Sequence, residues 1–92
     1  MLETEMANVI QRYTHLQSLL SAKRQASYNH KNVFPQSRLN YAEREISRIE
    51  ENMEIASLAL SENDRVTATA TIQEMTEAIY AIEDVLSGRA EF

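Results

Sequence analysis

The sequence predicts an all-α protein, a bundle of three amphipathic helices in one domain spanning residues 1–92. Two observations carry this prediction. One glycine and one proline among 92 residues leave almost no material for the tight turns of a β-rich fold. Apolar residues also recur at alternating spacings of three and four in three separate stretches, which is the period of a helix with one buried face.

The first helix is expected at about residues 3–28. Its buried seam has the spacing of successive helical turns and comprises Leu2, Met6, Val9, Tyr13, Leu16 and Leu20. Residues 29–37 break this pattern, and Pro35 disfavours helical geometry at Phe34. We therefore expect a linker over 29–37, with Pro35 at the first position of the next helix or Ser37 as its cap.

The second helix is expected at about 36–61 and has the clearest pattern in the chain. Its seam holds a period of three and four over three heptads, at Leu39, Ala42, Ile46, Ile49, Met53, Ala56 and Leu60. Capping residues at 61–64 then interrupt it. The third helix, at about 64–87, continues the period with Ala68, Ile72, Met75, Ile79, Ile82 and Leu86, and Gly88 follows as a terminating residue.

The short connection at residues 61–64 forces the second and third helices into an antiparallel hairpin. The first helix then has two possible places. It can fold back on the hairpin of its own chain, or it can be exchanged with a second protomer, because the linker is long enough to reach across. The narrow seams resemble those of coiled coils, which favours a homodimer or higher oligomer.

Composition limits the functional classes. The net charge is −5, yet residues 1–48 carry seven cations and four acids while residues 49–92 carry two cations and ten acids. This balance disfavours a general nucleic-acid binder and favours self-association or a polar partner surface. The chain lacks cysteine, long apolar runs and a basic, apolar leader, so we expect a cytoplasmic protein with no membrane association.

No residue pattern predicts catalysis, a metal or a cofactor. His15 has no histidine or carboxylate three or four residues away, and His30 lies in the linker beside Lys31. Carboxylate pairs such as Glu50 and Glu54 share a helix face, but an acidic outer face for solubility accounts for them. Nucleophile turns and glycine-rich phosphate loops are also missing. We therefore expect a protein that is not an enzyme.

Two regions are candidates for binding. Opposite the seam of the second helix, two heptad positions place an aromatic ring, two guanidinium groups and two aliphatic side chains on one face: Tyr41, Arg44, Arg48, Ile55 and Leu58. Side chains of these types dominate protein interfaces, so this face predicts a protein partner. The alternative is that the first helix packs over the same face.

The second candidate is a region in which cations alternate with aromatic rings, at Lys23, Arg24, Tyr28, Lys31, Phe34 and Arg38. Guanidinium groups and stacking rings could hold a small nucleotide-like anion, which would make the chain an oligomeric binder or sponge of that ligand. Ordinary cations near a helix C-terminus, solvated in a linker, are the alternative explanation.

In size and fold class the chain resembles the short, cysteine-free, acidic helical accessory proteins that bacteria and phages use as inhibitors, anti-defence factors or secretion chaperones. The resemblance assigns no role to any residue. It implies an expected function as a small, non-enzymatic protein-interaction module of the inhibitor, adaptor or chaperone type.

Overall fold

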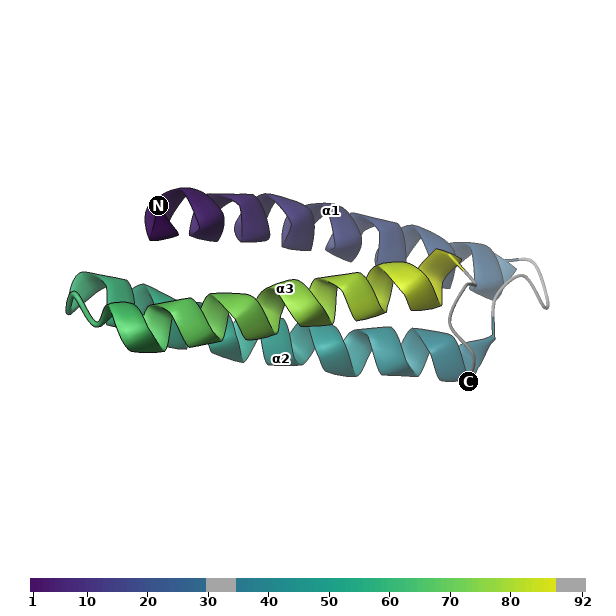
Figure 1. The fold of residues 1–92 in the computed structure, drawn as a ribbon. Helices are drawn as coiled ribbons and strands as arrows, with labels where there is room; N and C mark the ends of the chain where they lie inside the picture. The colour runs from purple at the N-terminus through teal and green to yellow at the C-terminus, as the bar shows by residue number, and fades with distance from the viewer. Residues whose placement is uncertain (30–34, 88–92) are drawn as a thin grey trace.

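Three helices make up the structure, a computed structural model that describes residues 1–29 and 35–87. They are α1 (Leu2–Asn29), α2 (Gln36–Ser61) and α3 (Arg65–Ser87), shown in Figure 1. The predicted all-α class, with α2 and α3 as an antiparallel hairpin, is confirmed. Most of the predicted linker, together with Gly88, lies outside the described residues.

The α2–α3 hairpin is the closest pair, and α1 lies along both of its helices. In Figure 1 the N-terminus lies toward the end of the bundle that holds the α2–α3 turn, while α3 ends where α1 ends and α2 begins. The three helices thus form an elongated body of 48 × 22 × 18 Å. Its long axis follows the helices, so each helix offers most of its outward face to the surroundings.

The core follows the predicted seams closely. The largest side chains with less than 2% exposure come from all three helices: Leu16, Leu39, Ile49, Met75, Ile79 and Ile82. Tyr13, Met53 and Leu60 belong to the same seams but are only partly buried. The seam positions therefore face a single shared core.

The buried stripe of α3 is wider than the predicted seam. Thr71, Ala78 and Val85 are buried in addition to the seam residues. The physical reason is that α3 contacts two helices, so one narrow row of side chains could not serve both. A strict coiled-coil seam is consequently wrong for α3, which has the broader stripe of a globular bundle.

The start of α2 differs from both predicted caps. Pro35 has φ −61° and ψ 135° and lies just before the first helical residue, and Ser37 lies inside the helix. The carbonyl of Pro35 accepts hydrogen bonds from the amides of Arg38 and Leu39 at 3.2 and 3.3 Å. The fixed φ of proline suits this flanking position, and no side-chain cap bond is formed there.

The α2–α3 turn combines the end of one helix with the start of the next. Asn63 has a positive φ of 59°, its amide bonds the Leu60 carbonyl at 3.2 Å, and the Asp64 amide bonds the Ala59 carbonyl at 2.8 Å. This pair of bonds is the Schellman arrangement. Asp64 Oδ1 then accepts a hydrogen bond from the Thr67 amide at 3.2 Å, which caps α3. Hydrogen bonds from the side chain and the amide of Thr67 lower the pKa of Asp64.

The conformation of Asn63 leads to a stability prediction. Replacing Asn63 with alanine should lower the free energy of unfolding by about 1 kcal/mol, since an ordinary side chain resists the left-handed region. Glycine at the same position should preserve stability, because it adopts positive φ freely. Urea denaturation of the three proteins checks this, and an alanine variant as stable as the glycine variant would contradict it.

Candidate functional site

The two flanks of α2 are occupied by its neighbours, which leaves one face open. On one flank, Tyr13 of α1 donates a hydrogen bond to Glu50 Oε2 at 2.5 Å, and Arg24 forms an ion pair with Glu43. On the other flank, Arg38 Nη1 donates to the Val85 carbonyl at 3.1 Å, linking α2 to α3. The face between these flanks is called here the outer face of α2, and it comprises Tyr41, Arg44, Arg48, Glu51, Ile55 and Leu58.

The outer face of α2 is largely exposed. Ile55 is 48% exposed and Leu58 is 59% exposed, although both are large aliphatic residues. Arg44, Arg48 and Glu51 are exposed as well, and Tyr41 is half-buried. The alternative in which α1 packs over this face is not what the chain adopts, because α1 contacts α2 on its flank.

A buried carboxylate organises the basic half of this face. Glu45 is 9% exposed, and Arg48 Nη1 donates to its two carboxylate oxygens at 3.0 and 3.2 Å. Burial raises the pKa of Tyr41 above its ordinary value, and the charge of Glu45 and its hydrogen bond to Tyr41 raise it further. The Arg44 guanidinium lies 6.0 Å from the centre of the Tyr41 ring. Tyr41 and Arg48 are thus held by contacts with Glu45, so this half of the face is ordered within the chain itself.

Sequence reasoning missed Glu45. It lies four residues after Tyr41 and three residues before Arg48, so the spacing for both contacts is visible in the sequence. The spacing cannot show that Glu45 is buried when the hairpin packs. Charged residues are seldom buried unless paired, and composition alone gives Glu45 no distinction from the exposed acids nearby.

The predicted anion-binding residues do not converge on one point. Arg24 is paired with Glu43 and Arg38 is bonded to the end of α3. Lys23 lies in a groove between α1 and α3. Lys31, Phe34 and the side chain of Tyr28 lie outside the part of the chain that the structure describes. The three described cations therefore lie at three different places in the bundle and do not form one site.

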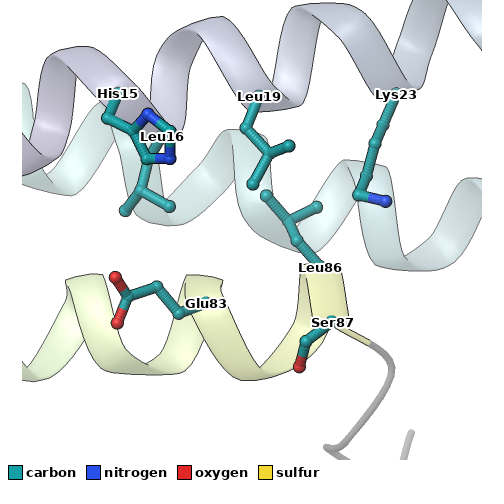
Figure 2. A pocket seen from close by; sticks show the side chains of 7 residues that line it. All are labelled: His15, Leu16, Leu19, Lys23, Glu83, Leu86 and Ser87. Carbon is teal, nitrogen blue, oxygen red and sulfur yellow. The ribbon is translucent and has the colours of Figure 1, made fainter.

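The groove that contains Lys23 has a volume of about 540 Å³ and is shown in Figure 2. Three leucines form its apolar part and four polar residues complete it: His15, Leu16, Leu19, Lys23, Glu83, Leu86 and Ser87. Glu83 is already bonded to Arg12 at 2.9 Å, and Arg12 also lies 4.7 Å from the Tyr80 ring. The lining of this groove carries the negative charge of Glu83 as well as the positive charge of Lys23, so it is a poor anion site.

Within residues 1–29 and 35–87, no group of three or more histidine, aspartate and glutamate side chains is arranged to hold a metal ion. His15 instead lines the groove beside Leu16 (Figure 2).

None of the helices, over its described length, has an apolar stretch that could cross a membrane.

Comparison with protein-family models, curated proteins and solved structures gives no match. The interpretation of the outer face of α2 therefore depends on the geometry and chemistry of its own residues.

The contact between Tyr13 and Glu50 leads to a pH prediction. Burial, followed by the Glu50 hydrogen bond and charge, raises the pKa of Tyr13 from 10.0 to about 12. The folded state thus holds the phenol proton more tightly than the unfolded state. Its stabilising contribution is fully present below pH 10 and is lost between pH 10 and about 12.

Urea denaturation at several pH values across this window should show stability falling in the wild type and falling less steeply in Tyr13→Phe. The decline should not vanish in the variant, because the pKa of Tyr41 is raised too. Parallel pH profiles for the two proteins would show that Tyr13 does not hold α1 on the flank of α2.

Proposed function

We propose that this chain is a small, non-enzymatic protein-interaction module that presents the outer face of α2 to another protein chain. The observation that carries the proposal is the exposure of Ile55 and Leu58 on the same helix face as Arg44, Arg48 and half-buried Tyr41. Isolated exposed aliphatic residues need no explanation, but this group combines apolar, aromatic and guanidinium side chains in one line.

The energetics favour a binding role. Fully burying an exposed aliphatic side chain of this size contributes about 1.5–3 kcal/mol. Ile55 and Leu58 are each about half exposed, so covering both would contribute about 1.5–3 kcal/mol in total. Tyr41 and Arg48 are already fixed by Glu45. Ordering them costs little entropy on binding, which leaves more of the contact energy as affinity.

The cellular setting is also part of the proposal. The cysteine-free composition supports a reducing, cytoplasmic compartment. An inhibitor, adaptor or chaperone-type accessory protein of bacterial or phage origin would fit a rigid helical body with one binding face. No catalytic step is assigned to any residue.

The small-anion hypothesis stays a prediction and is not preferred. Arg24 and Arg38 are engaged with groups of their own chain, and Glu83 adds negative charge to the groove that Lys23 lines. The Arg38 guanidinium, bonded to the Val85 carbonyl in the last turn of α3, stabilises that helix end without any ligand.

Site-specific photo-crosslinking tests the proposed function. A benzophenone amino acid at Ile55 should capture a protein partner in cells of the source organism, because this position would lie in the interface. The matched control is Val66 of α3, which is also β-branched and is 82% exposed.

Substitution with glutamate supplies the second half of the test. Leu58→Glu should weaken capture from position 55 at least about tenfold while Val66→Glu does not, since a charge in an apolar contact costs more than 1.4 kcal/mol. Far-ultraviolet circular dichroism confirms that the variants are folded. Equal capture from Ile55 and Val66 would exclude the outer face of α2 as the binding surface.

A further inference from the structure

The outer face of α2 has the spacing of a second heptad seam. Its residues occur at alternating intervals of three and four, which is the same interval as the buried seam on the opposite side of the helix. In order, they are Tyr41, Arg44, Arg48, Glu51, Ile55 and Leu58. A helix with this second row of positions can pack side by side with another helix along that row.

The residues of this seam match the residues of a second copy of the seam that runs in the opposite direction. Reading it from both ends toward the middle pairs Tyr41 with Leu58, Arg44 with Ile55, and Arg48 with Glu51. An antiparallel helix pair places residues opposite each other in this reversed order. A twofold axis between Ile49 and Glu50 would therefore generate all three pairings twice.

Each of the three pairings is chemically favourable. The Tyr41 ring would cover the partner's Leu58, and the methylene stem of Arg44 would lie over the partner's Ile55 with its guanidinium in solvent. At the centre, Arg48 would meet the partner's Glu51, an exposed carboxylate that has no ion pair in the described part of its own chain. The two central pairs of the dimer, each Arg48 with Glu51, thus join opposite charges.

The parallel arrangement is unfavourable for the same residues. It would place Arg44 against the partner's Arg44, Arg48 against the partner's Arg48 and Glu51 against the partner's Glu51. Like charges juxtaposed in an interface cost several kcal/mol, so charge selects the antiparallel orientation. Opposed helix dipoles add a small further preference.

The rest of the bundle leaves room for this contact, since α1 and α3 are bonded to the two flanks of α2 and not to its outer face. We propose that the partner of the outer face of α2 is a second copy of the same chain, bound antiparallel about a twofold axis. This inference rests on the proposed function, because it names the partner of the same face. It requires no exchange of α1.

The expected dimer is reversible. From Tyr41 to Leu58 the seam spans about 26 Å of helix, which gives an interface at the small end of those in stable complexes. A micromolar dissociation constant is expected, so the chain should be a monomer when dilute and a dimer when concentrated. Sedimentation equilibrium should therefore show the mass rising from 10.6 kDa toward twice that value.

Charge substitutions test the pairing. Glu51→Arg gathers four guanidinium groups at the axis and should weaken dimerisation at least about tenfold. Adding Arg48→Glu to that variant restores opposite charges across the axis and should recover most of the affinity. Glu77→Arg is the matched control, because it makes the same charge change on the exposed surface of α3 and should leave dimerisation unchanged.

Spin labels supply a measurement that does not depend on the stability of a charge variant, because Arg48→Glu also disturbs Glu45. The chain has no cysteine, so single labels at Ser47 and Ser61 are unambiguous. Both serines are exposed and lie at the same heptad position. The proposed axis separates paired labels along the helix by about 8 Å at residue 47 and about 35 Å at residue 61.

A broadened spectrum at residue 47 with a dipolar distance near 35 Å at residue 61 would support the antiparallel dimer. Short distances at both positions would indicate a parallel pair and overturn it. A monomer at every concentration would also overturn it, and so would a dimer formed by exchange of α1. If the chain is monomeric while Ile55 still captures a different protein, the proposed function stands and only the second copy is excluded.

Discussion

The wide apolar stripe of α3 is the constraint on which the rest of the bundle depends. Because α3 contacts both other helices, it buries three residues beyond its seam, including Thr71. That hydroxyl donates to the Thr67 carbonyl at 2.7 Å, so its burial leaves no unpaired polar group. α2 also buries Glu45 and Ala59 beyond its seam, while its outer face remains exposed.

The helices could be predicted from the sequence because their periodicity is long and uninterrupted. The seam from Leu39 to Leu60 and the turn chemistry at Asn63 and Asp64 are both local signals, which determine secondary structure without knowledge of the neighbours. The cap of α2 could not be predicted as well, since Pro35 is compatible with more than one position at a helix start.

The candidate site was harder to predict than the fold, for a physical reason. Heptad arithmetic places Ile55 and Leu58 opposite the seam, but whether they are exposed depends on where α1 packs. That position is determined by contacts between residues far apart in the chain, namely Tyr13 with Glu50 and Arg24 with Glu43. The role of Glu45 depends likewise on burial, which only the packed hairpin shows.

Glu45 also has a consequence for substitutions on the outer face of α2. Its carboxylate is buried, and the arginine that neutralises it, Arg48, belongs to the outer face of α2. A substitution that removed Arg48 would leave this carboxylate with its hydrogen bond from Tyr41 but without its ion pair, which is destabilising for a buried charge. The proposed binding surface is therefore tied to the stability of the monomer. A change at Ile55 or Leu58 alters that surface alone, whereas a change at Arg48 also removes the ion pair of Glu45.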